Sequence, residues 1–409
     1  MVSSDTVLGL GGTVDYEIEW DSSVLEALAV EYGVTVSELT TAQPIATERD
    51  LLVSVLAFLQ TGAGGERFVA SSGIVETFAA RFSSRVTLGG TGVRAARAME
   101  VLGVTSTLHL VSIDDHVRRL LPAGSDYISS ADRDTTDPHL IIQFPVGAMV
   151  RIGGVALTAS HANRLIYSND PPNQTLFLSD ELPSVLELAR VFLISGFNSM
   201  QDAAALDERL AQLRAAMVRL PREAVVFYED SGFHRPEFSV RVRDALLEVI
   251  DIYSMNEDEL ETHLGRAIDL LDPDAVRVAL TDIESLIPAR ELVVHTKYWS
   301  AILGDGASSF RDALQGGITM ASTRYRFGDV FTPSDYAVMS QQTLNAEGVA
   351  LAADLERAVP GLVCLPGFLL EDEHPTTIGL GDSFVGGFIA ALMHGSTAPA
   401  PPTSSGRLL

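Results

Sequence analysis

The sequence has one cysteine, Cys364, and one lysine, Lys297, among its 409 residues. A single cysteine excludes an internal disulfide and is typical of a protein in a reducing compartment. The scarcity of lysine excludes a P-loop, because the GxxxxGK[ST] pattern needs a lysine directly after a glycine and Lys297 follows His-Thr. Any binding of nucleotide phosphates must therefore use another arrangement.

Positively charged residues are also outnumbered by negatively charged ones, and long apolar runs are absent from the sequence. The chain carries 28 lysines and arginines against 54 aspartates and glutamates, a formal net charge of −26. Nucleic acids and anionic membranes attract basic surfaces, so we expect neither as a partner. No apolar run reaches the roughly 20 residues of a membrane-spanning helix, and the start, MVSSDTVLGLGG, lacks the pattern of a signal peptide. We expect a cytoplasmic protein that acts on small molecules as a monomer or small homo-oligomer.

What the sequence does contain is an alternation of short apolar strands with amphipathic helices. This pattern predicts an α/β fold with a mainly parallel central sheet. The expected strands are Thr6–Leu10, Thr107–Ile113, Val191–Ile194, Ala224–Tyr228, Ile250–Tyr253 and Glu291–His295. The expected helices are Gly92–Leu102, Ala203–Arg219, Ser239–Glu248, Glu257–Leu264, Pro273–Ile287 and Ser383–Met393.

Two regions interrupt the alternation and predict a second, smaller domain. Residues 16–84 are rich in helices, and residues 139–168 contain successive strands. We interpret 139–168 with part of 16–84 as a lid, and residues 1–15, 85–138 and 169–396 as a large nucleotide-binding α/β domain. The Pro- and Ser-rich end, 397–409, is typical of a disordered tail.

Most expected strands end in a polar or glycine cluster. Ligands of open α/β sheets bind outside the carboxyl ends of the strands. We therefore expect these clusters to meet in one crevice. They are GGTVD (11–15), SIDD (112–115), SGFNS (195–199), EDSG (229–232), SMNE (254–257) and HTK (295–297).

Near the C-terminus, TTIGLGDSFVGGFIAAL places Asp382 between two glycines and an apolar run with helical spacing. Asp382 could be the N-cap of that helix. Alternatively, Gly379 and Gly381 could let backbone amides approach a phosphate at the helix start. The residues alone leave both interpretations open.

A second glycine turn lies in RVTLGGTGVRAARAMEVLG, residues 85–103. The spacing Gly90-x-Gly92-x-x-Ala95, with Asp114 further on, allows a packing turn, a small-ligand site or a dinucleotide site. Asp15, which follows the first glycine turn, could accept hydrogen bonds from sugar hydroxyls or simply stabilise its own turn.

Several strand ends carry charged groups. Ser254 and Glu257 have the spacing of a capping box, which leaves Asn256 and Glu259 to order a magnesium ion through its waters or to form a solvated acidic face. Two adjacent carboxylates, Glu229 and Asp230, would repel each other unless a cation lies near.

Basic and aromatic groups also occur at such positions. His295 and Lys297, followed by two aromatic residues, suit an adenine nucleotide, although the aromatics could belong to the core. Arg164, in HANRLIYSND, is either a phosphate clamp or an ordinary surface arginine.

Taken in order along the chain, five segments resemble the ADP-dependent glucokinase and phosphofructokinase family of the ribokinase-like superfamily. They are GLGGTVD (9–15), NRLIYSND (163–170), SMNEDEL (254–260), VVHTKYWSAILG (293–304) and GLGDSF (379–384). The resemblance implies a three-layer α/β/α domain with a lid rich in β-strands. It also implies phosphoryl transfer from ADP, with Mg²⁺, to a hydroxyl of glucose or fructose 6-phosphate.

The resemblance assigns roles to individual residues. The catalytic group is Asp382 as base with Gly379, Leu380 and Gly381 as anion hole, and the metal ligands are Glu229 and Glu259. From the resemblance together with the strand-end residues, we expect substrate binding by Asp15, Gly89, Gly90, Gly92, Arg164 and Asn198, and nucleotide binding by Asn256, His295, Thr296 and Lys297.

One departure from the family pattern bears on function. Phe227 stands where the family's His-x-Glu element has histidine, two residues before Glu229. An ATP-dependent sugar or nucleoside kinase, a non-catalytic sugar- or nucleotide-binding protein and a dinucleotide-dependent oxidoreductase are the alternatives.

Overall fold

The computed structural model describes residues 4–370 and 378–395, and the predicted disordered tail lies outside them. Within this part of the chain, nine strands form one sheet in the order β16-β15-β14-β13-β12-β11-β1-β5-β6. All neighbours are parallel except β15, which is antiparallel to β14 and β16. The predicted mainly parallel sheet is confirmed. Its strands are β1 (Thr6–Leu8), β5 (Ser106–Leu110), β6 (Ser125–Ser129), β11 (Val191–Ile194), β12 (Val225–Glu229), β13 (Ile252–Asn256), β14 (Glu291–His295), β15 (Trp299–Gly304) and β16 (Leu362–Pro366).

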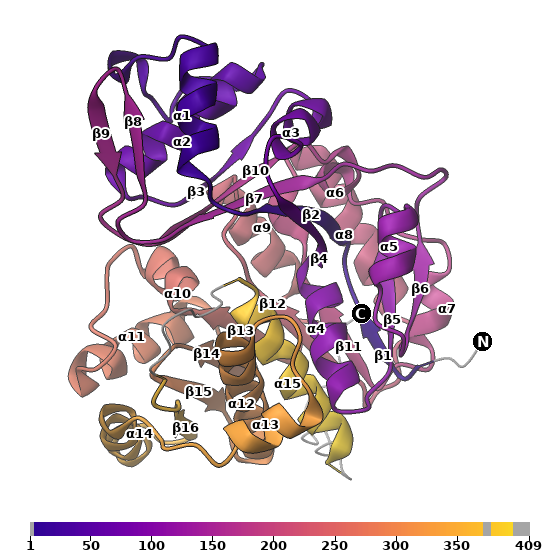
Figure 1. Ribbon diagram of the computed structural model, residues 1–409. Coiled ribbons are helices and arrows are strands. Elements are labelled where there is room, and N and C mark those ends of the chain that lie inside the picture. Colours follow the sequence, from indigo (N-terminus) through magenta and orange to yellow (C-terminus); the bar gives the residue numbers. More distant parts are fainter. Residues whose placement is uncertain (1–3, 371–377, 396–409) are drawn as a thin grey trace.

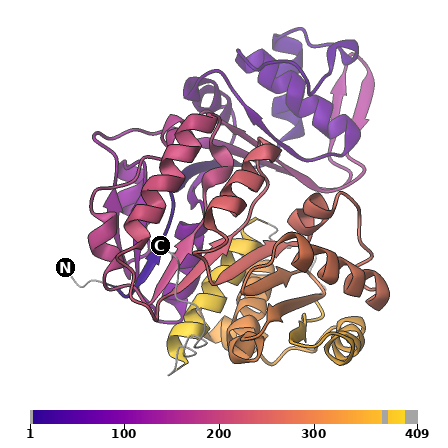
Figure 2. The same cartoon turned by 180° about the vertical axis from the view of Figure 1, so that it is seen from behind.

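Helices cover both faces of this sheet, so the domain has three layers (Figures 1 and 2). The central strands are apolar and buried along their whole length, as parallel strands between two helical layers must be. One face packs on α4 (Thr91–Val101), α5 (Asp115–Leu120), α12 (Arg311–Phe327), α13 (Pro333–Met339) and α15 (Leu380–His394). The other packs on α7 (Leu182–Leu186), α8 (Ala203–Met217), α9 (Pro236–Leu246), α10 (Glu257–Leu264), α11 (Pro273–Leu286) and α14 (Ala346–Ala358).

Helix α15 is packed unusually closely between α4 and α12 (Figure 1). A Cβ atom on Gly386 would come within 2.6 Å of the Ala95 carbonyl oxygen in α4. A Cβ atom on Gly387 would collide with the Gly316 carbonyl oxygen in α12. Adjacent glycines thus let the two neighbours approach the backbone of α15 from different sides.

A second sheet of five strands has the order β3-β10-β7-β2-β4. Its strands are β2 (Thr13–Ile18), β3 (Gly65–Phe68), β4 (Ser84–Gly89), β7 (His139–Phe144) and β10 (Asn163–Ser168). The strands predicted over 139–168 are confirmed, and a hairpin of β8 (Met149–Ile152) and β9 (Val155–Thr158) lies between β7 and β10. One face of this sheet packs on α1 (Ser22–Glu31), α2 (Glu48–Thr61) and α3 (Ser72–Ala79).

The register of the five-stranded sheet places polar residues on its other face. Asp15 pairs with Thr87 on one side and with His139 on the other. Glu17 follows two positions along β2, and Arg164 lies on the same face of β10. Because side chains alternate along a strand, these residues point away from the apolar core beneath α1, α2 and α3.

The strands and helices expected for the large domain are present, and their ends differ from the expected ends by at most three residues. The displacement matters most at α15, which begins at Leu380 rather than Ser383 and so takes Asp382 into its first turn. No helix of the described residues is both long and apolar enough to cross a membrane.

A buried histidine gives the fold a pH dependence. His109 of β5 is fully buried, and its Nε2 accepts a hydrogen bond from the Ser179 amide at 2.9 Å. Burial lowers the pKa of His109 to about 4, against about 6.5 in an unfolded chain. The stability that depends on neutral His109 is therefore present above pH 6.5 and lost as the pH falls towards 4.

We expect His109→Gln to weaken this dependence, because glutamine does not gain a proton. Linkage gives the wild type a loss of up to about 3 kcal/mol from this group below pH 6.5. Urea unfolding of both proteins at pH 7 and pH 4.5 measures the difference. Equal losses in the two proteins would contradict the assignment.

Candidate active site

The turn before α15 has the geometry of an anion site. Gly379 is the N-cap residue with φ 67°, a conformation that glycine adopts without strain. No side chain of the described residues caps this helix, and Asp382 is its third residue, so the interpretation of Asp382 as N-cap is wrong. The first amides of a helix lack intrahelical acceptors, and those of α15 receive no side-chain cap from the described residues.

Arg94 of α4 connects two of the predicted site residues. Its Nη2 lies 2.8 Å from Asp15 Oδ2, and its Nη1 lies 3.7 Å from Asp382 Oδ2. Burial on its own lowers the pKa of Arg94, but Asp15 and Asp382 outweigh it and keep that pKa above its ordinary value. A charged guanidinium therefore lies between the two carboxylates.

The predicted glycines of the 85–103 segment have different surroundings. A Cβ atom on Gly89 would collide with Asp15, and one on Gly90 would come within 2.9 Å of the Gly12 Cα. These two positions let β4 and the start of α4 approach the Asp15 turn. Gly92 instead faces the core residues Leu8 and Leu108.

On the other side of the turn lie Glu229 and His295, which end β12 and β14. His295 Nε2 is 3.0 Å from Glu229 Oε1, and the imidazole stacks on Phe384 at 4.4 Å. A Cβ atom on Gly381 would be 3.4 Å from the His295 Cε1 and 3.7 Å from Glu229 Oε1. Burial on its own lowers the pKa of His295, but the Glu229 carboxylate outweighs burial, so that the pKa lies above its ordinary value. This favours a charged imidazole.

The adjacent carboxylates Glu229, which ends β12, and Asp230, which follows it, have different partners. Asp230 accepts hydrogen bonds from Tyr253 Oη at 2.8 Å and Tyr228 Oη at 3.3 Å, and it pairs with His263 Nε2 at 2.7 Å. These contacts are separate from the Glu229–His295 pair, so each acid has its own partner. Asp230 and His263 line a cavity of about 470 Å³ between α9 and α10, with Glu259 at its wall.

The capping box of α10 differs from the predicted one. Asn256, not Ser254, is the N-cap, because β13 continues to Asn256 in register with His295. Asn256 Oδ1 accepts from the Glu259 amide at 3.1 Å, and Glu259 Oε2 accepts from the Asn256 amide at 2.8 Å. Burial raises the pKa of Glu259 to about 8. The predicted capping pair of Ser254 and Glu257 is thus wrong.

Residues 5–343 match the family model described as the ADP-specific phosphofructokinase/glucokinase conserved region. The chain belongs to this family. It is accordingly an ADP-dependent sugar kinase, a phosphotransferase with a hydroxyl acceptor. No curated protein sequence matches it.

Solved structures with the same fold have low sequence identity to this kinase. A hypothetical ADP-dependent phosphofructokinase from Pyrococcus horikoshii OT3 is 16% identical, with a TM-score of 0.78 over 96% of this chain and 98% of that one. An ADP-dependent kinase in complex with fructose-6-phosphate and ADPβS is 11% identical, with a TM-score of 0.70 over 96% and 94%. Adenosine kinase from Trypanosoma brucei brucei is 14% identical, with a TM-score of 0.52 over 97% and 94%. The predicted ribokinase-like fold is confirmed.

Phe227, for which the resemblance implies a histidine, is fully buried. Its ring packs on Phe388 of α15 with centroids 5.2 Å apart. The residue therefore supports α15 from beneath, while Glu229 keeps its place at the end of the strand.

Other predicted residues lie at the edges of the crevice. Thr296 Oγ1 accepts from the Tyr298 and Trp299 amides and so holds the turn between β14 and β15. Lys297 is exposed in that turn, with its Nζ 4.9 Å from the Tyr298 ring. Asn198 lies in the 3₁₀ turn Phe197–Ser199, where its carbonyl accepts from the His234 amide at 3.4 Å. Their ligand-binding roles, like those of Gly92 and Arg164, stay predictions.

Sequence reasoning missed two arginines. Besides Arg94, Arg324 of α12 lies beneath the glycine turn, where its Nε donates to the Ile378 carbonyl at 2.6 Å. Arg324 also pairs with Asp329 at 2.6 Å. Apart from its place after the glycine turn, nothing in the local sequence marks Arg94, because its partners come from distant parts of the chain.

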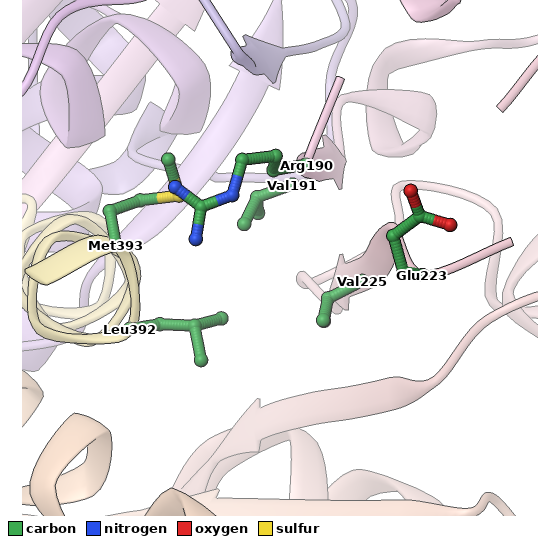
Figure 3. A pocket seen from close by; sticks show the side chains of 6 residues that line it. All are labelled: Arg190, Val191, Glu223, Val225, Leu392 and Met393. Carbon is green, nitrogen blue, oxygen red and sulfur yellow. The ribbon is translucent and has the colours of Figure 1, made fainter. Parts of the chain in front are cut away.

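A small cavity of about 30 Å³ lies far from this site, where β11 and β12 begin and α15 ends (Figure 3). Leu392 and Met393 of α15 face Val191 and Val225 there. This volume suffices for about one water molecule. The cavity therefore has no part in the kinase site.

Proposed function

We propose that this kinase transfers the terminal phosphoryl group of ADP to a hydroxyl of a hexose or hexose phosphate, glucose or fructose 6-phosphate, with Asp382 as general base. The observation that carries the proposal is the helix start at Gly379–Asp382, which no side chain of the described residues caps and which lies next to Arg94 and the Glu229–His295 pair. Phosphoryl transfer depends mainly on positioning and on stabilising negative charge. This turn supplies both a carboxylate and oriented amides.

In this mechanism the acceptor hydroxyl lies against Asp382, which takes its proton as the new O–P bond forms. The amides of the first turn of α15 donate to oxygens of the transferring group, and each such donor can contribute roughly 3–4 kcal/mol to lowering the barrier. The bond from that phosphorus to the bridging oxygen breaks, and AMP leaves. Arg94, already bonded to Asp15, fixes the distance between the acceptor side and the base.

Magnesium fits the residues at the ends of β12 and β13. Glu229 Oε2 is buried without a close hydrogen-bond partner among the described residues, and Ser254 lies beside it in register. No three His, Cys, Asp or Glu side chains of the described residues converge on one metal position. Mg²⁺ commonly binds through one or two carboxylates with waters and phosphates, so Glu229 and Glu259 suffice. The ion would neutralise charge on the phosphates of ADP.

We further propose that the five-stranded sheet and its helices act as a lid. The face that carries Asp15, His139 and Arg164 bears the polar groups suited to a sugar or its phosphate. Contact with the large domain already exists, since Phe68 of β3 packs on His234 at 4.4 Å and Glu66 lies 3.4 Å from the same imidazole. Closure would exclude water, which otherwise competes as acceptor.

Replacing Asp382 by asparagine tests the proposed chemistry. We expect turnover to fall by at least about 10³-fold, since the amide cannot take a proton, while ADP binding persists. Coupled assays with ADP or ATP and with glucose or fructose 6-phosphate, alongside calorimetry of ADP binding, measure both effects. Turnover within a few-fold of wild type would remove Asp382 as base, and preference for ATP would remove ADP as donor.

The magnesium requirement should depend on pH through Glu259. With a pKa of about 8, this carboxyl is largely protonated at pH 7 and becomes a better cation ligand as the pH rises to 9. We expect the half-saturating Mg²⁺ concentration of the wild type to fall over that range. Glu259→Gln should show a higher requirement at pH 9 and little change with pH. Matching titration curves for the two proteins would leave Glu259 as a helix cap alone.

A further inference from the structure

The Arg94 guanidinium is oriented by more than its pairing with one buried carboxylate. Its Nη2 bonds Asp15 at 2.8 Å, and its Nε points to the Leu88 carbonyl at 3.5 Å. These contacts engage one edge of a planar group whose donors have fixed directions. The side chain is 12% exposed, so the guanidinium is not completely enclosed.

That remaining edge faces the predicted base. Arg94 Nη1 lies 3.7 Å from Asp382 Oδ2, which is too long for a hydrogen bond. The same nitrogen would be 2.7 Å from a Cβ atom on Gly379, so it also borders the start of the anion turn. Among the described residues this nitrogen has no acceptor within hydrogen-bonding distance, and it borders both the base and the start of the turn.

We propose that Arg94 is a catalytic residue that donates to an oxygen of the phosphoryl group while that group passes from ADP to the acceptor. The inference rests on the proposed function and adds a residue to its machinery. As the acceptor O–P bond forms and the bond to the bridging oxygen of ADP breaks, AMP takes the electron pair and Asp382 takes the acceptor's proton. Arg94 keeps its own proton throughout, and only its charge and N–H donors act.

The chemistry of the step favours an arginine at this position. Negative charge is spread over the three oxygens of the transferring group, and the guanidinium fork matches phosphate oxygens. Arg324, which is also near the turn, already donates to Ile378 and pairs with Asp329. Lys297 lies in the exposed turn after β14. In the part of the chain that the structure describes, Arg94 is the basic side chain paired with Asp382.

The test is the loss and chemical rescue of turnover in Arg94→Ala. We expect kcat to fall about 10²–10³-fold, as for removal of one donor to a developing oxyanion. KM for ADP should stay within about threefold of the wild-type value, and added guanidinium ion should raise the kcat of the variant at least about tenfold.

Arg97→Ala is the matched control. Arg97 lies on the same helix and is exposed, and its Nε donates to the Asp329 carbonyl at 3.4 Å. This variant should keep the wild-type kcat and show no increase with guanidinium. Thermal melting of every variant establishes that the proteins compared are folded.

A folded Arg94→Ala protein with wild-type kcat, or with a lowered kcat that guanidinium does not raise, overturns the role of Arg94. If the unpaired Asp15 prevents folding of that variant, Arg94→Lys is the test instead. Lysine has one ammonium nitrogen in place of the two guanidinium nitrogens that contact Asp15 and face Asp382. A loss of at least about tenfold in kcat with unchanged KM supports the role, and wild-type kcat removes it. Absence of ADP-dependent turnover in the unsubstituted chain would instead remove the proposed function itself.

Discussion

The packing of α15 between α4 and α12 is the constraint on which the candidate site depends. Glycines at 316, 386 and 387 remove the side chains that would hold the three helices apart. Because the backbones approach so closely, Arg94 from α4 reaches Asp382, and Arg324 from α12 reaches the carbonyl just before the glycine turn. A larger residue at any of these glycines would move the turn relative to both arginines.

Charge in the site is organised in pairs, although the chain as a whole is strongly acidic. Arg94 lies between Asp15 and Asp382, and His295 pairs with Glu229. A protein with a net charge of −26 would repel a nucleoside diphosphate such as ADP over long distances. In the proposed mechanism local groups therefore bind the nucleotide, namely backbone amides, a few arginines and a cation held by carboxylates.

Much of this arrangement could be predicted from the sequence, and the exceptions have physical reasons. Alternation of strands and helices predicted the main sheet, and the convergence of strand ends predicted that Glu229, Asn256 and His295 would be neighbours. Capping-box spacing alone could not choose between Ser254 and Asn256, since both have an acid three residues later. The choice follows from pairing of β13 with β14, which is a long-range interaction. Arg94 was missed for the same reason, because its partners are 79 and 288 positions away in the sequence.

The central claim is that the phosphoryl group passes over the first turn of α15, between its amides, Arg94 and Asp382. A crystal structure with magnesium, a non-transferable ADP analogue and the acceptor sugar tests it most directly. The account predicts terminal phosphate oxygens within about 3 Å of amides in this turn and an acceptor hydroxyl within about 3 Å of Asp382. A terminal phosphate bound elsewhere, with Asp382 still facing Arg94 and no ligand between them, would contradict it.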